Sequence, residues 1–133
     1  LKEVRRALLD ADVNFKIADI LDFKNPFEQG VFDLIVSNPP YVKMDEKPQM
    51  NENVLNFEPH LALFVPDQDP LKYYKEIASI AKKHLTNHGN LMVEINAALG
   101  NETANLFENL GFKSTKIIQD FYERDRFVIA KGF

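Results

Sequence analysis

The stretch over residues 31–41, which reads VFDLIVSNPPY, decides the fold. Its first seven residues form a continuous, largely apolar run rich in branched side chains, which is typical of a strand buried on both faces of a parallel sheet. Pro39 and Pro40 then remove backbone donors and fix φ, so the strand cannot continue beyond Asn38. The sequence therefore predicts a buried parallel strand over residues 31–37 that ends in an Asn-Pro-Pro turn.

Helices and strands alternate on the carboxyl side of this strand. Apolar residues at helical spacing predict helices over residues 71–84 and 97–110. Buried or alternating apolar residues predict three strands, over residues 90–95, 113–119 and 126–130. The connection between the last two strands is too short for a helical crossover, so we expect them to be antiparallel.

Two further elements are predicted before the deciding stretch. An amphipathic pattern predicts a helix over residues 1–11, and an alternating pattern predicts a strand over residues 14–18. The whole order of elements predicts an α/β layered sheet with an antiparallel strand at its C-terminal end. Because the chain starts at Leu1 with no signal-peptide pattern before it, we expect it to begin inside a larger protein.

The composition is that of one ordinary soluble globular domain, with 133 residues, 45% hydrophobic and 27% charged. The 16 Lys and Arg residues against 20 Asp and Glu residues give a net charge of −4, so capture of a nucleic-acid backbone is not expected as the main source of affinity. The absence of cysteine excludes disulfides and thiolate zinc sites and is compatible with a cytoplasmic protein. No apolar run approaches the roughly 20 residues that a membrane span needs.

Residues 41–70 show neither helical nor strand periodicity. A segment of about 30 residues without a regular pattern inside a compact domain is typical of a functional loop or of disorder. Five apolar residues favour an ordered loop that packs against the domain, namely Leu55, Phe57, Leu61, Leu63 and Phe64.

Polar residues stand at the ends of three predicted strands. Asp19, Asn38 and Glu94 lie at or near carboxyl ends, where ligands gather in an open α/β sheet. The Asn38 carboxamide oxygen and the Pro39 carbonyl are two acceptors on a rigid backbone. They can hold a planar NH₂ group with its nitrogen lone pair toward an electrophile. The ring of Tyr41 can pack on the flat face of that group, so the stretch predicts a site that works by orientation.

The stretch resembles the class I S-adenosylmethionine-dependent methyltransferases that methylate planar amino groups, whose hallmark is Asn or Asp followed by Pro-Pro-Tyr. Among these enzymes the chain is similar to the HemK/PrmC group, the glutamine-N5 methyltransferases of peptide chain release factors. Four further motifs support the narrower resemblance: EPHLAL at residues 58–63, YYKEI at 73–77, LMVEI at 91–95 and DRFV at 125–128. The resemblance implies a Rossmann-like fold and methyl transfer to the side-chain amide nitrogen of a glutamine in a release factor.

The resemblance also implies which residues meet the substrate. Asn38 and the carbonyl of Pro39 would be the catalytic acceptors of the glutamine amide. Pro40 and Tyr41 would form part of the wall around it. Glu58 would bind substrate, although capping of local backbone amides is an open alternative for this residue. Glu94 is interpreted as a structural partner of nearby backbone or of a basic side chain.

For the cofactor, the resemblance implies S-adenosylmethionine. Asp19 and Ile20 match the acidic-plus-apolar pair near the adenine, and Asn38 would also contact the cofactor. Helix capping or a solvated turn is the alternative for Asp19. The five glycines form no glycine-rich cofactor loop. We therefore expect residues 1–133 to be the C-terminal portion of a single methyltransferase catalytic domain, with its N-terminal portion missing.

Two other functions stay open from the sequence. An N-methyltransferase acting on adenine or guanine in DNA or RNA could use the same two acceptors, but the acidic net charge makes nucleic acid an unlikely direct substrate. A non-catalytic interaction fragment is the second alternative. The three histidines share no ligand spacing, so no metal site is expected, and no membrane partner is expected either.

Overall fold

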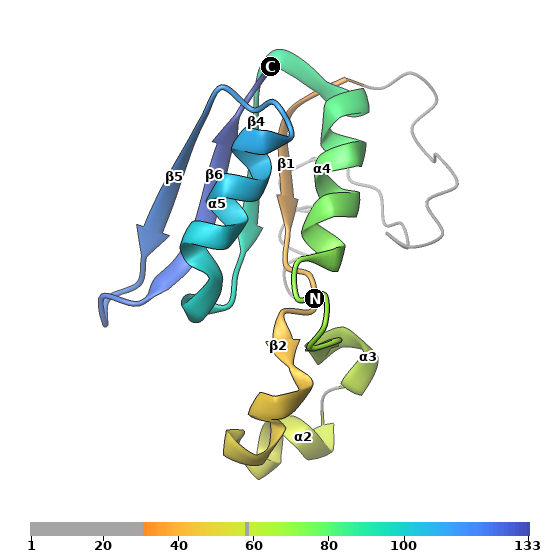
Figure 1. Ribbon diagram of the computed structural model, residues 1–133, viewed down its shortest axis with the longest axis vertical. Helices are drawn as coiled ribbons and strands as arrows, with labels where there is room; N and C mark the ends of the chain where they lie inside the picture. Colours follow the sequence, from red (N-terminus) through yellow and green to blue (C-terminus); the bar gives the residue numbers. More distant parts are fainter. Residues whose placement is uncertain (1–30, 58) are drawn as a thin grey trace, which may run out of the picture.

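The computed structural model describes residues 31–57 and 59–133. Its main body is a sheet of four strands in the order β1-β4-β6-β5, with two longer helices on one face (Figure 1). The strands are β1 (Phe32–Ser37), β4 (Leu85–Glu94), β5 (Ser114–Gln119) and β6 (Asp125–Lys131), and the two helices are α4 (Lys72–His84) and α5 (Gly100–Asn109).

The sheet is parallel at one edge and antiparallel at the other. β1 and β4 pair in parallel, with Ile35 opposite Leu91. β6 pairs antiparallel with both β4 and β5. The predicted α/β sheet with an antiparallel C-terminal end is therefore confirmed. The elements predicted over residues 1–11 and 14–18 lie outside the described residues.

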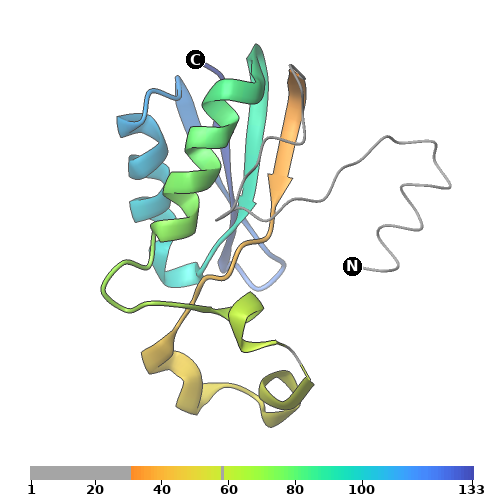
Figure 2. The same ribbon diagram turned by 90° about the vertical axis from the view of Figure 1, so that its right-hand side faces the viewer.

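The hydrophobic core lies between the sheet and the two helices, which share one side of it (Figure 2). Apolar side chains from the helices and the strands are buried there, including Tyr74, Ile77, Leu91, Val93, Phe107 and Val128. The ring of Phe107 on α5 meets that of Tyr74 on α4 edge-on, with 6.4 Å between centroids. This is a favourable geometry for two aromatic rings, so the pair fixes how the helices lie against each other.

The helix ends follow the sequence prediction in part. A short 3₁₀ turn, η2 (Ala97–Leu99), precedes α5, and Gly111 follows it with a φ of 99°, as expected for a residue that ends a helix. α4 ends at His84 as predicted, but β4 begins directly at Leu85 rather than at residue 90. Gly89 lies inside this strand, where a Cβ atom would stand 2.9 Å from the Phe32 carbonyl of β1.

The burial predicted for β1 is only half right. Phe32 and Ile35 pack against the core, but Leu34 and Val36 are 56% and 65% exposed. β1 is an edge strand of the sheet that the described residues form, and the helices cover only one of its faces. The prediction of a strand buried on both faces is therefore wrong for the part of the chain that the structure describes, while its parallel pairing is confirmed.

The segment between β1 and α4 holds five short elements. They are β2 (Val42–Lys43), η1 (Met44–Gln49), α2 (Glu52–Phe57), α3 (His60–Leu63) and β3 (Phe64–Val65). β2 and β3 pair in parallel, and this pairing accompanies the burial of Phe64. Phe57 and Leu61 are 83% and 82% exposed, so the expectation that all five apolar residues pack is wrong. Their helices lie beyond the end of the sheet at which β1 finishes, away from the core (Figure 1).

Candidate active site

The Asn-Pro-Pro segment lies directly beyond the carboxyl end of β1. Ser37 at the end of β1 is in register with Val93 of β4, so the segment leaves the sheet beside Glu94. The side chain of Asn38 is exposed, whereas Pro39 is buried. An exposed carboxamide on a buried, rigid turn at the carboxyl end of a parallel strand is well placed to bind a ligand.

Tyr41 is held at both its side chain and its backbone. The phenol hydroxyl donates to Glu94 Oε1 at 2.7 Å, and the backbone carbonyl accepts from Asn96 Nδ2 at 3.2 Å. Asn96 is buried and also donates to Glu46 Oε2 at 2.8 Å. The chain after Pro40 is therefore fixed by residues that are distant in the sequence.

The two tyrosines around Glu94 are neutral hydrogen-bond donors. Burial and the neighbouring Glu94 carboxylate raise the pKa of Tyr41 to about 12. Burial also raises the pKa of Tyr74, whose hydroxyl donates to the backbone carbonyl of Glu94 at 3.0 Å. Neither phenol is therefore available as a general base near neutral pH.

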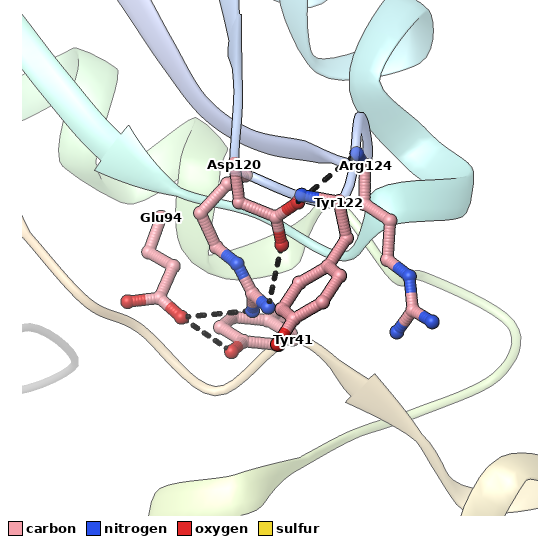
Figure 3. A network of polar contacts seen from close by, with 6 residues as sticks. Tyr41, Glu94, Asp120, Tyr122 and Arg124 are labelled. Atoms are coloured by element: carbon pink, nitrogen blue, oxygen red, sulfur yellow. Dashed lines mark hydrogen bonds and ion pairs between the residues drawn. The ribbon is translucent and has the colours of Figure 1, made fainter.

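Glu94 joins Tyr41 to the hairpin of β5 and β6 (Figure 3). Arg126 Nη1 lies 3.4 Å from Glu94 Oε1, and its Nη2 lies 3.4 Å from Asp120 Oδ2. We name Tyr41, Glu94, Arg126 and Asp120 the Tyr41 network. The interpretation of Glu94 as the partner of a basic side chain is confirmed.

Asp120 anchors the turn between β5 and β6. Its Oδ1 accepts the backbone N–H groups of Tyr122 at 2.8 Å and of Arg124 at 3.1 Å (Figure 3). The bond from the Arg124 N–H is the main cause that lowers the pKa of Asp120, which therefore stays ionised. Sequence reasoning missed this residue, although an Asp that bonds the backbone two residues later is a common turn signal.

The segment beside the Asn-Pro-Pro turn engages its own charged groups. Lys43 Nζ pairs with Asp45 at 3.0 Å, and the Lys43 backbone N–H donates to Glu46 Oε2 at 2.8 Å. Lys47 Nζ lies over the ring of Phe64, 5.8 Å from its centroid. Both lysines of this segment are therefore already in contact with groups of the chain itself.

Four of the seven predicted site residues lie together in the structure. Asn38, Pro39, Pro40 and Tyr41 are contiguous at the end of β1, while Asp19, Ile20 and Glu58 lie outside the described residues. Within residues 31–57 and 59–133, no group of three His, Cys, Asp or Glu side chains could hold a metal ion. No helix in the described part of the chain is long and apolar enough to span a membrane.

Comparison with known sequences finds relatives that match nearly the whole chain. The chain is 45% identical over 121 residues to a release factor glutamine methyltransferase of Flavobacterium psychrophilum and 43% identical over 123 residues to one of Bacteroides thetaiotaomicron. These alignments cover 91% and 92% of this chain but 42% and 44% of the relatives, so the chain spans less than half of their length. A bifunctional methyltransferase of Rickettsia bellii is 40% identical over 73% of this chain and 17% of that protein. No protein-family model matches the chain.

The fold is similar to that of a solved methyltransferase from Pyrococcus furiosus. The TM-score is 0.55 at 18% sequence identity, and the match covers 97% of this chain and 56% of that one. This similarity confirms the α/β fold of class I methyltransferases that the motifs implied. In sequence the chain is similar to release factor glutamine methyltransferases, and in fold it is similar to a solved methyltransferase.

Proposed function

We propose that the full-length protein transfers a methyl group from S-adenosylmethionine to the side-chain amide nitrogen of a glutamine in a peptide chain release factor. The observation that carries this proposal is the position of Asn38 and Pro39 at the carboxyl end of β1. The chain is also 45% identical to a release factor glutamine methyltransferase. The reaction would take place in the cytoplasm, where release factors act.

The proposed catalysis addresses the low nucleophilicity of the substrate's amide nitrogen. An amide nitrogen is a poor nucleophile because its lone pair is delocalised into the carbonyl. In the proposal, the carboxamide oxygen of Asn38 and the carbonyl of Pro39 accept the two amide protons and turn the nitrogen toward the methyl group. They also stabilise the positive charge that develops on nitrogen as the carbon–nitrogen bond forms and the carbon–sulfur bond breaks. The excess proton then passes to water.

The methyl donor supplies an electron-poor methyl group on a sulfonium, so the protein needs no metal ion or covalent intermediate. Of the residues assigned to the donor, Asn38 is the one within the described part of the chain, and its exposed carboxamide fits a ligand beyond the sheet edge. Asp19 and Ile20 would complete this chain's share of the donor site. Residues 1–133 would form the C-terminal portion of a single catalytic domain, because they match less than half the length of the relatives.

Local charge favours a protein substrate over a nucleic acid. Between residues 42 and 64 the sequence has two lysines against four acidic residues, so the local balance is 2 − 4 = −2. Lys43 is already paired with Asp45, and Lys47 lies over Phe64. A neutral glutamine on a protein loop tolerates this surface, whereas a phosphate backbone requires free Lys and Arg. Glu58 is proposed as a further substrate contact on this segment.

The test is methyl transfer by the purified full-length protein. With a donor that carries a labelled methyl group, label should appear in a release factor and be absent from DNA and ribosomal RNA. Asn38→Ala should lower the rate on the order of 10²–10³-fold, because one charge-stabilising acceptor is removed. Asn105→Ala removes an exposed carboxamide from α5 and should leave the rate unchanged.

Two outcomes would contradict the proposal separately. Label in nucleic acid with none in release factors would show that the substrate is wrong, although the methyl-transfer chemistry would survive. Full activity of the Asn38→Ala variant on release factors would show that the acceptor is wrong, whatever the substrate.

A further inference from the structure

We infer that Arg126 and Asp120 are positioning residues that act through Glu94 to hold Tyr41, and with it the Asn-Pro-Pro acceptors, in the geometry that methyl transfer needs. This inference rests on the proposed function. It adds to the reaction two residues of the β5–β6 hairpin that do not belong to the Asn-Pro-Pro-Tyr segment.

One carboxylate oxygen of Glu94 is shared by Tyr41 and Arg126. Glu94 Oε1 accepts the Tyr41 hydroxyl at 2.7 Å and also lies 3.4 Å from Arg126 Nη1 (Figure 3). The side chain of Glu94 is 22% exposed, so it is largely withdrawn from water. The guanidinium places a positive charge beside the same carboxylate oxygen and so helps to fix its position, and a hydrogen bond from the phenol to a carboxylate is a strong, charge-assisted one.

Arg126 is itself held in place by a second carboxylate, that of Asp120. Its second terminal nitrogen lies 3.4 Å from Asp120 Oδ2, while Asp120 Oδ1 is occupied by the backbone N–H groups of Tyr122 and Arg124. The planar guanidinium therefore bridges two carboxylates with two different nitrogens. A lysine has one terminal nitrogen and cannot reproduce this fork.

The position of Tyr41 restricts the position of the two acceptors, Asn38 and Pro39. Two prolines with fixed φ separate Tyr41 from Asn38, so few backbone torsions between them are free. When the Tyr41 ring and carbonyl are both held, the direction of the Pro39 carbonyl is restricted as well. In orientation-dependent catalysis, a displacement of about 1 Å costs on the order of 100-fold in rate.

Stability does not explain this arrangement. The Arg126 side chain is 38% exposed, and ion pairs in such positions contribute little to folding. Lys75 and Asp69 form a more exposed ion pair at 2.8 Å near the start of α4, outside the Tyr41 network. Lys75→Met therefore removes a cation and its ion pair without touching the Tyr41 network.

The experiment compares Arg126→Met, Arg126→Lys and the control Lys75→Met in the full-length protein. Arg126→Met should lower kcat for release factor methylation by roughly ten- to a hundredfold, with the KM for the methyl donor unchanged. Arg126→Lys should recover only part of the rate, because it keeps the charge and loses the fork. The melting temperatures should show that both Met variants are folded at the assay temperature, and Lys75→Met should keep the wild-type kcat.

A double-mutant cycle tests whether Arg126 acts through Tyr41. Arg126→Met should have little further effect on kcat in a Tyr41→Phe background, since the phenol that it positions is already gone. Multiplying effects of the two substitutions, or a wild-type kcat for Arg126→Met, would overturn the inference.

A readout without turnover keeps this inference separate from the proposed function. The ¹³C resonance of the Tyr41 ζ carbon should move in Arg126→Met and stay in place in Lys75→Met. If the wild-type protein fails to methylate release factors, the proposed function is wrong and this resonance alone decides whether Arg126 positions Tyr41. An unmoved resonance in Arg126→Met overturns the inference in either case.

Discussion

The hydroxyl group of Tyr41 is kept protonated by its surroundings. Burial removes water from the phenolate, the adjacent Glu94 carboxylate repels it, and together they raise the pKa from 10.0 to about 12. Because the folded-state pKa is the higher one, the stabilisation linked to this proton is complete below pH 10 and is lost as the pH rises through about 12. The bond to Glu94 is therefore intact throughout the physiological range.

Removing the charge of Glu94 should lower the pKa of Tyr41. In Glu94→Gln the repulsion of the phenolate disappears, but burial is the larger cause and remains, so the pKa should stay above 10.0. A pH titration of the ¹³Cζ resonance measures this, and Tyr41→Phe identifies the signal. Glu76→Gln, an exposed change on α4, should leave the titration as it is. Equal midpoints in Glu94→Gln and wild type would show that Glu94 does not influence this phenol.

The helices and strands could be predicted where the signal lies within a short stretch of sequence. Helical spacing predicted α4 and α5, and the short connection before β6 predicted its antiparallel pairing with β5. The exposure of Leu34 was not predictable in this way, because periodicity does not tell which faces of a strand are covered. The helices α2 and α3 were likewise not predictable, because six and four residues are too few to establish a helical period.

The candidate site was likewise predictable only where its residues are contiguous in the sequence. The Asn-Pro-Pro-Tyr segment is contiguous and could be recognised from its sequence, including the position of Asn38 after a strand. The contact of Tyr41 with Glu94 joins residues 53 positions apart, and the Asn96 contact joins residues 55 apart. A single sequence carries no information on which distant polar residues pair, so the network became visible only with the fold.

The packing of α5 on the sheet should depend on Phe107. This side chain is fully buried against Tyr74 and Phe112, so Phe107→Ala should leave a cavity and lower the free energy of unfolding by about 3–5 kcal/mol. Phe121→Ala makes the same chemical change at a fully exposed position in the β5–β6 turn and should stay within about 0.5 kcal/mol of wild type. Urea denaturation measures both. Similar losses for the two variants would contradict the placement of α5 over the core.

The distribution of charge discriminates between the two classes of substrate, protein and nucleic acid, that Asn38 and Pro39 could serve. The net charge is −4, and the segment next to the Asn-Pro-Pro turn is itself acidic. Arg126, the cation joined to Tyr41 through Glu94, is shared between two carboxylates. Arg126 and Lys43 are thus paired with acidic side chains, which a phosphate backbone would have to displace.

This distribution of charge predicts a weak salt dependence. A protein that contacts 6–10 phosphates of a nucleic acid loses about 10³–10⁵-fold in affinity between 50 and 200 mM salt. The reason is that the release of condensed counterions on binding yields less free energy at higher salt. Recognition of a neutral glutamine on a protein loop releases few counterions, so the KM of the full-length protein for a release factor should change by less than about tenfold over the same range. Initial rates of methyl transfer at several salt concentrations measure this, with Asp45→Lys as the matched variant. It reverses one charge on the exposed segment and frees Lys43, and the dependence should stay weak because the bound glutamine is neutral. A thousandfold rise in KM for the wild-type protein would instead point to a phosphate-binding surface, and the choice of a protein substrate would then have to be given up.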